Sequence, residues 1–175
     1  MNVKRQPQGN RNRAAEKERL RRRYLPSRVR ILFVGEAPPA SERFFYQADS
    51  GLYRAFRDTF QIVFPALSDA DFLESFREMG CYLVDLCGKP VDRLSNSERR
   101  RACVNGEGRL CRILKQLYPQ IVVVVVRSIV PSARRSIEKA GWEGQLLELP
   151  YPGRWQHHRL TFTKQLLPVL GKLKR

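Results

Sequence analysis

Six consecutive apolar residues at 121–126 (IVVVVV) constrain the fold of this chain more than any other feature of its sequence. Because the run does not alternate with polar residues, it is typical of a strand buried on both faces of a parallel sheet. A bilayer requires about 20 apolar residues, and Arg127 ends this run far earlier. No apolar stretch follows the basic start of the chain, so a secretion signal is not expected either. We therefore expect a sheet protein without a membrane partner.

Strands and helices are expected to alternate along the rest of the chain. Short apolar runs predict three further strands, at residues 29–34, 81–87 and 145–149. Apolar residues at helical spacing predict helices in the intervals, at residues 50–64, 69–79, 95–117, 131–140 and 161–173. Gly106 and Gly108 are candidates for an interruption of the third helix. This order predicts an α/β protein of three layers, α/β/α, with a four-stranded, mostly parallel central sheet.

The chain carries 33 Lys and Arg against 17 Asp and Glu, a formal net charge of +16. Eleven of these cations, but only two of the acids, lie in the first 30 residues. We predict that residues 1–28 form a basic, flexible arm, with a helix between Ala14 and Tyr24, and that residues 29–175 form the folded domain. Such a surplus favours a polyanionic partner, most often nucleic acid. The alternatives are a mitochondrial transit peptide and a charge that only solubilises the protein.

Ligands of parallel sheets bind beyond the carboxyl ends of the strands. Four segments of this chain follow predicted strands, at residues 35–46, 87–94, 127–131 and 150–158. Chemistry is therefore expected in these four segments.

The same segments resemble motifs of the uracil-DNA glycosylase superfamily, in the same order. Residues 35–39 (GEAPP) resemble the Gly-Glu-Ala-Pro-Gly motif of its thermophilic and iron–sulfur branches, and residues 87–93 (CGKPVDR) resemble Cys-Arg-Pro-Pro-Gly-Asn-Arg. Residues 119–126 match a proline before an apolar strand, and residues 149–154 (LPYPGR) stand where the family has His-Pro-Ser. The resemblance spans about residues 29–170. It implies a DNA glycosylase that hydrolyses the N-glycosidic bond of a flipped, damaged or deaminated base during DNA repair.

Two residues are expected to carry this chemistry. Breaking the bond builds positive charge on the sugar and negative charge on the departing base. Glu36 is the only carboxylate at the start of the first segment, so we expect it to position water or to stabilise the sugar cation. Tyr151 replaces the family histidine and, as a neutral phenol, is expected to donate to the base. Alternatively, Glu36 only shapes its loop through backbone amides, and the tyrosine leaves altered chemistry or an inactive protein.

The resemblance also places a base-binding pocket on this chain. Its expected members are Gly35, Ala37, Pro38, Phe45, Tyr46 and Asp92. One of the two aromatic rings would stack on the flipped base, unless two of the three rings at residues 44–46 belong to the core. Asp92 stands in place of a uracil-reading Asn, and an ionised Asp only accepts hydrogen bonds. We therefore predict that selectivity for uracil is lost or moves toward a base presenting donors, unless Asp92 is only a surface residue paired with Arg93.

Contacts to DNA are expected from two of the four segments. The residues assigned to them are Arg127, Ser128, Pro152, Gly153, Arg154, Trp155, His157, His158 and Arg159. The arginines suit phosphates, and Trp155 would wedge into the base stack or anchor the loop as a half-buried side chain.

The cysteines bear on the cofactor prediction. Cys87 and Cys103 match the third and fourth cluster ligands of the iron–sulfur branch, but residues 1–80 contain no cysteine. Since a cluster normally needs four thiolates, we expect no cofactor, and buried free thiols instead. We expect a cytoplasmic, nucleoid-associated monomer that binds DNA. Two other functions stay open: a nucleic-acid-binding protein of this fold that has lost catalysis, and a protein that binds a nucleotide or an RNA.

Overall fold

A computed structural model describes residues 8–174, with side chains from residue 12 onward. Its centre is a four-stranded sheet of order β2-β1-β3-β4 in which all neighbours are parallel. The strands are β1 (Ile31–Gly35), β2 (Cys81–Asp85), β3 (Ile121–Val124) and β4 (Gln145–Glu148). The first three strands are fully buried, as the unbroken apolar runs predict.

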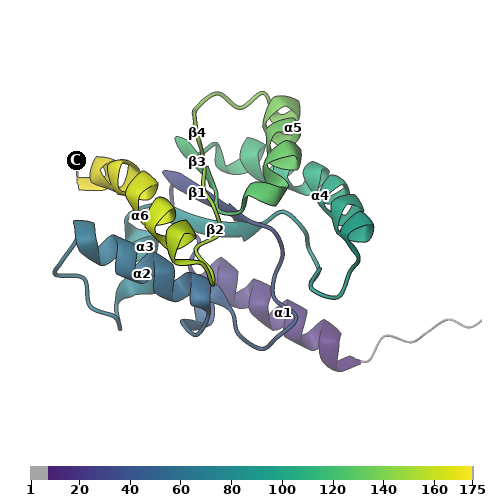
Figure 1. Cartoon of the computed structure of the whole chain (residues 1–175), viewed down its shortest axis with the longest axis horizontal. Coiled ribbons are helices and arrows are strands. Elements are labelled where there is room, and N and C mark those ends of the chain that lie inside the picture. The colour runs from purple at the N-terminus through teal and green to yellow at the C-terminus, as the bar shows by residue number, and fades with distance from the viewer. Residues whose placement is uncertain (1–7, 175) are drawn as a thin grey trace, which may run out of the picture.

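Helices cover both faces of this sheet (Figure 1). The helices are α1 (Gln8–Arg23), α2 (Gly51–Val63), α3 (Phe72–Glu78), α4 (Asn96–Leu117), α5 (Val130–Ala140) and α6 (Gln156–Gly171). One face carries α4 packed beside α5, and α2 packs beside α6 on the other. The prediction of a three-layer α/β/α fold around a four-stranded parallel sheet is therefore confirmed. None of the helices in residues 8–174 combines the length and apolar character needed to cross a bilayer.

An aromatic cluster fills the space between the sheet and the helices on the α2 side. Phe33 of β1 lies edge-on to Phe56 of α2, with ring centroids 4.8 Å apart, and near Phe76 of α3 at 5.7 Å. All three rings are completely buried. Burying aromatic side chains of this size contributes about 1.5–3 kcal/mol each and fixes the two helices against β1.

Helix α4 runs without a break through Gly106 and Gly108, so the expected interruption is wrong. At Gly106 the helix comes very close to the end of β2, where a Cβ atom would lie 2.4 Å from the Leu86 carbonyl oxygen. Glycine is needed there for backbone approach rather than for a bend. A capping box at Ser95 and Glu98 begins this helix, with both reciprocal hydrogen bonds.

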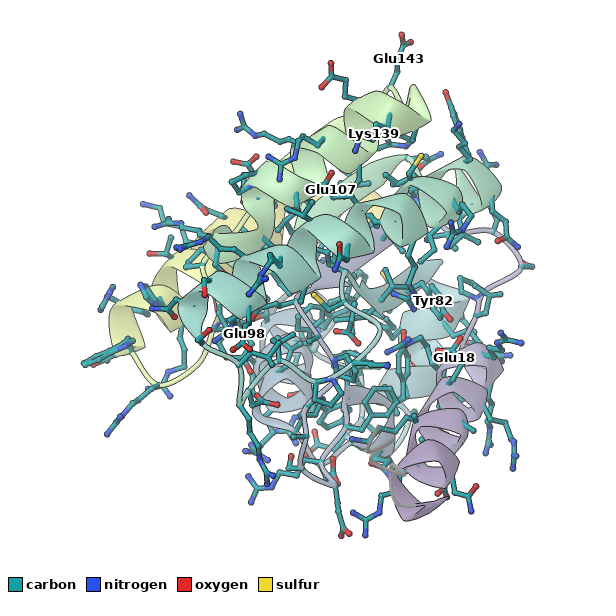
Figure 2. The ribbon with its side chains drawn as sticks, turned by 90° about the vertical axis from the view of Figure 1, so that its right-hand side faces the viewer. Glu18, Tyr82, Glu98, Glu107, Lys139 and Glu143 are labelled. Atoms are coloured by element: carbon teal, nitrogen blue, oxygen red, sulfur yellow. The ribbon has the colours of Figure 1, made fainter. Side chains whose placement is uncertain are left out.

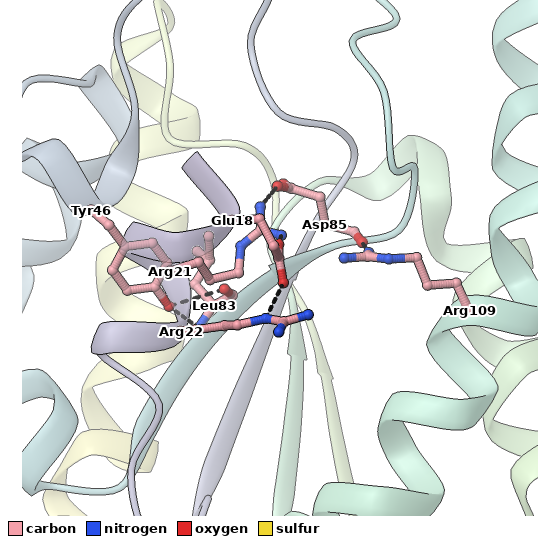
Figure 3. Close-up of polar contacts among 7 residues, drawn as sticks. All are labelled: Glu18, Arg21, Arg22, Tyr46, Leu83, Asp85 and Arg109. Atoms are coloured by element: carbon pink, nitrogen blue, oxygen red, sulfur yellow. Dashed lines mark hydrogen bonds and ion pairs between the residues drawn. The ribbon is translucent and has the colours of Figure 1, made fainter. Parts of the chain in front are cut away.

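Within the predicted basic arm, residues 8–23 form α1, which includes most of the helix predicted between Ala14 and Tyr24, and the end of α1 packs against the domain. Arg21 of α1 pairs with Asp85 at the end of β2, Nη2 to Oδ2 at 2.7 Å, and the two side chains are only 7% and 9% exposed (Figure 3). Tyr24 stacks on Tyr46 with ring centroids 5.5 Å apart. A buried ion pair and an aromatic stack fix the end of α1 on the domain, which periodicity alone does not reveal. The rest of the predicted arm at residues 1–7 lies outside the described residues.

Helix α1 also holds the loop that follows β1. The Lys17 ammonium donates to the carbonyl oxygens of Pro39 and Ser41, at 3.1 and 2.8 Å. An exposed ion pair of 3.2 Å joins Arg13 to Glu42 in the same loop. The segment predicted to carry the chemistry is therefore bound by the basic helix.

Candidate active site

The carboxyl ends of the strands bring the predicted segments to one edge of the sheet. Backbone hydrogen bonds continue the pairing beyond the strands, from Val125 N to Val34 O at 3.0 Å and from Leu149 N to Val124 O at 2.8 Å. Beyond β1 and β2, Cys87 N donates to Glu36 O at 2.8 Å. The first residues of these loops are thus fixed by the sheet itself, and the side chains that follow β1 and β2 face a common region.

Glu36 lies at this edge, where its carboxylate binds Arg99 from the first turn of α4. Arg99 Nε lies 2.6 Å from Oε1, and Nη2 contacts Oε2. The Glu36 side chain is only 11% exposed, and the hydrogen bond to its carboxylate raises the pKa of Arg99. Bidentate pairs of this kind fix both groups in orientation. Among the described residues, no backbone amide donates to the Glu36 carboxylate, in contrast to the alternative expectation.

Arg99 is a site residue that the sequence analysis missed. A signal was present, because the capping box places the start of α4 just after β2, at the carboxyl edge. A residue in the first turn of that helix is therefore near the loop after β1. Cys103 and Gly106 are buried and therefore determine the rotation of α4 about its axis. This rotation decides which of the arginines at 99, 100 and 101 faces the loop.

Two thiols lie beside this ion pair. Cys103 Sγ lies 4.0 Å from Glu36 Oε1 and 3.9 Å from Cys87 Sγ. Burial, with a contribution from Cys103, raises the pKa of Cys87 to about 12, and burial also raises the pKa of Cys103. Both thiols therefore stay protonated near neutral pH and are poor nucleophiles. Within residues 8–174, no three His, Cys, Asp or Glu side chains are grouped to hold a metal ion.

Asp92 connects two of the loops at the edge. Its Oδ2 accepts a hydrogen bond of 2.9 Å from the backbone N–H of Ala40, in the loop after β1. The partner is thus a backbone amide, and the alternative pair with Arg93 does not occur among the described residues. This bond orders the loop that begins with Glu36.

Tyr151 comes from the loop after β4 and is 45% exposed. Its ring lies over Gly153, where a Cβ atom would be 2.7 Å from Tyr151 Cδ1. Partial desolvation and the charge of Asp92 raise the pKa of the phenol. The hydroxyl is consequently protonated at physiological pH and is available as a donor.

The predicted base-stacking rings lie in the core, so that assignment is corrected. Phe45 and Tyr46 are 3% and 2% exposed. The Tyr46 hydroxyl accepts from Leu83 N at 2.7 Å and donates to Leu83 O at 3.0 Å, which satisfies backbone groups of the edge strand β2 (Figure 3). Of the other expected pocket members, Gly35 is buried against Asp85, whereas Ala37 and Pro38 are half-buried at the edge.

The residues predicted to contact DNA divide into accessible and buried members. Exposed side chains are those of Arg127 and Ser128 after β3 and of Arg154, Trp155, His157 and Arg159 after β4. Pro152 is buried, so its assignment is corrected, whereas Gly153 and His158 are half-buried. His157, His158 and Arg159 lie in the first turn of α6, which begins five residues before the predicted helix. Trp155 is 59% exposed and is therefore not a half-buried anchor.

In a scan against protein-family models no family matches this chain, and a search of curated proteins gives no match either. The likeness to uracil-DNA glycosylases therefore depends on the four ordered motifs and stays a prediction. The geometry brings a shielded carboxylate, a protonated phenol and exposed arginines to one edge of a parallel sheet.

Proposed function

We propose that this protein is a DNA glycosylase that hydrolyses the N-glycosidic bond of a flipped base at the carboxyl edge of its sheet. The observation that carries the proposal is the Glu36 carboxylate, held by Arg99 directly after β1. A carboxylate in fixed orientation can bind the attacking water and offset positive charge on the sugar. The four ordered motifs support the same assignment.

The proposed reaction uses two side chains of the chain. Water adds to the sugar C1′ while its proton passes to the Glu36 carboxylate, and the electron pair of the broken C–N bond leaves with the base. The protonated phenol of Tyr151 donates a hydrogen bond to the base oxygen on which negative charge develops. Exposed Trp155 takes over the aromatic contact that the buried rings of Phe45 and Tyr46 are unable to make.

A second candidate function, binding of nucleic acid without cleavage, is supported by the Glu36–Arg99 pair. Both carboxylate oxygens of Glu36 are occupied by Arg99, which suits a structural ion pair as well as a catalytic group. A protein that binds nucleic acid through the same edge without cleaving it would have the same arrangement. Catalysis requires Arg99 to release one oxygen for water or to share it.

Base release from oligonucleotides distinguishes the two functions. Uracil, hypoxanthine and xanthine are offered in single strands and duplexes, because Asp92 predicts a preference for bases that present donors. Glu36→Gln is expected to lower the rate by about 10²–10⁴-fold and Tyr151→Phe by about 10²–10³-fold. Unchanged melting temperatures separate lost chemistry from lost folding, and Glu138→Gln, at an exposed carboxylate of α5 outside the proposed site, is the matched control. Activity that survives Glu36→Gln refutes the catalytic assignment, and salt-sensitive binding without any base release favours the second function.

A further inference from the structure

The outward side of α4 is a second cationic surface, separate from the edge that holds Glu36. From Arg100 onward the exposed residues of this helix are Arg100, Arg101, Val104, Asn105, Gly108, Arg112, Lys115 and Gln116. Their spacing places them on one face, opposite the buried residues Cys103, Leu110 and Leu114. We call these eight residues the α4 face; it carries four cations and no carboxylate.

The acids of α4 do not compensate these cations. Glu98 belongs to the capping box, where it binds the backbone N–H and the hydroxyl of Ser95. Glu107 is 2% exposed and turns toward α5, where Arg135 and Lys139 bind it at 2.7 and 3.0 Å (Figure 2). Among the side chains described, from residue 12 to 174, no ion pair involves any of the four cations of the α4 face. Their charge is therefore open to a partner.

Gly108 leaves the centre of the α4 face without a side chain. It lies in the middle of the exposed side, and a Cβ atom there would meet only the tip of Arg112, 4.0 Å away. Glycine at an exposed helix interior is unfavourable relative to alanine, and here no packing requires it. A flat position between cations allows a partner to come close to the helix backbone.

We propose that the α4 face binds the phosphate backbone of duplex DNA next to the site of base excision. The choice of DNA depends on the function proposed above, and the charge of the face selects a polyanion on its own. Arg100 and Arg112 are twelve residues apart, which corresponds to about 18 Å along a helix, long enough to reach several phosphates of a duplex. The face contains no aromatic ring to stack on an unpaired base, so a rigid row of phosphates fits it better than a single strand.

The test measures binding of the full chain to a short fluorescein-labelled DNA duplex by anisotropy at rising KCl concentrations. Arg100→Ala, Arg112→Ala and Lys115→Ala are combined, and the matched control combines Arg54→Ala, Lys164→Ala and Lys174→Ala on the α2 and α6 side. Each phosphate contact contributes about 0.9 to the slope of log affinity against log salt, so the α4 variant is expected to lose about 3 in slope. The control removes the same formal charge and is expected to lose far less.

A second pair of variants adds charge without removing a contact. Gly108→Glu introduces a carboxylate into the α4 face, and replacing this glycine also favours the helix. The control, Gln165→Glu, introduces a carboxylate at an exposed position of α6. Only Gly108→Glu is expected to weaken duplex binding. Equal losses in both triple variants, an unchanged slope in the α4 triple variant, or tighter binding of the same sequence as a single strand or as duplex RNA overturns the inference. Because base release from a single strand is measured separately, failure of this interface is distinguishable from failure of the glycosylase proposal.

Discussion

Gly106 and Gly108 both lie in α4, only two residues apart, but they differ in the atoms that a Cβ atom would meet. A methyl group at Gly106 would meet the Leu86 carbonyl oxygen, whereas one at Gly108 would meet only the tip of the Arg112 side chain, 4.0 Å away. The backbone of β2 is unable to move away without disturbing the sheet. The same substitution is therefore expected to have opposite effects at the two positions.

Gly106→Ala is expected to destabilise the protein by about 1–3 kcal/mol, because the overpacked helix must move off β2. Gly108→Ala is expected to stabilise it by about 0.5–1 kcal/mol, because the exposed helix loses a glycine. Urea unfolding followed by circular dichroism measures both. Effects of the same sign would contradict the close approach of α4 to β2.

The Tyr46 hydroxyl is a second case in which one atom has a defined structural role. Tyr46→Phe leaves Leu83 N and Leu83 O of the edge strand without their partner in a buried position. The expected loss is about 1–3 kcal/mol, since a buried unsatisfied group costs that much. Tyr53→Phe, which removes a bond to the Asp69 carbonyl in a more open place, is the control with the smaller loss. Equal losses in the two variants would show that the edge strand does not depend on Tyr46.

At the scale of elements, the docking of α1 depends on a charge buried in the domain. Burial raises the pKa of Asp85, while the guanidinium groups of Arg21 and Arg109 lower it, and burial dominates. The Arg109 guanidinium also donates to the Asp85 backbone carbonyl (Figure 3). Removing one partner of a buried pair leaves the other charge uncompensated.

Arg21→Met is expected to cost about 3–5 kcal/mol near neutral pH. The pKa of Asp85 is higher in the folded state than the ordinary Asp pKa of about 3.9, so the folded state keeps the Asp85 proton to a higher pH than the unfolded state does. The free energy of unfolding therefore falls as the pH rises above about 3.9. Without Arg21 that pKa rises further, so the variant is expected to lose more stability than the wild type as the pH rises from about 4 toward neutral. Melting temperatures across this range measure the difference. Adding Asp85→Asn removes the ionisable group, and a persistent extra pH dependence in that double variant would refute the assignment to Asp85.

The elements themselves were predictable, but the contacts between them were not. Periodicity and capping signals are local, so the strands, the helices and the order of layers followed from runs such as residues 121–126 and from Ser95. The pairs Arg21–Asp85 and Arg99–Glu36 join residues 64 and 63 positions apart. Their formation depends on helix rotation and loop paths, which a local pattern does not contain. For the same reason, the sequence predicted that Phe45 or Tyr46 stacks on a base, whereas both rings are buried in the core.

For the molecule as a whole, the net charge of +16 has two structural roles. Some cations hold the fold together, as Lys17 and Arg21 do by fixing α1 on the loop after β1 and on β2. Others, such as Arg19 and the four cations of the α4 face, lie exposed at the surface. The basic residues of α1 therefore include side chains that hold the fold together as well as exposed ones.

A chain that begins at Leu25 is expected to lose stability strongly, because Asp85 loses Arg21 and the ring of Tyr46 loses Tyr24. The full chain with Arg13→Ala, Arg19→Ala and Arg22→Ala keeps those contacts and is expected to melt within a few degrees of the wild type, since surface charges contribute about 0–1 kcal/mol. Differential scanning fluorimetry compares the three proteins. Equal melting temperatures of the truncated and full chains would show that the residues before Leu25 form an arm that does not stabilise the domain.

The separation of Arg21 from Asp85 also has a consequence for biosynthesis. Arg21 is synthesised 64 residues before its partner Asp85, and at about 5–20 residues per second this delay lasts about 3–13 s. During this interval α1 has no β2 to bury its guanidinium, and the nascent chain presents a strongly cationic segment with no sheet behind it. Polyanions are therefore expected to reach the basic segment around Arg21 before the domain exists, and completion of β2 is the step that withdraws Arg21 from them.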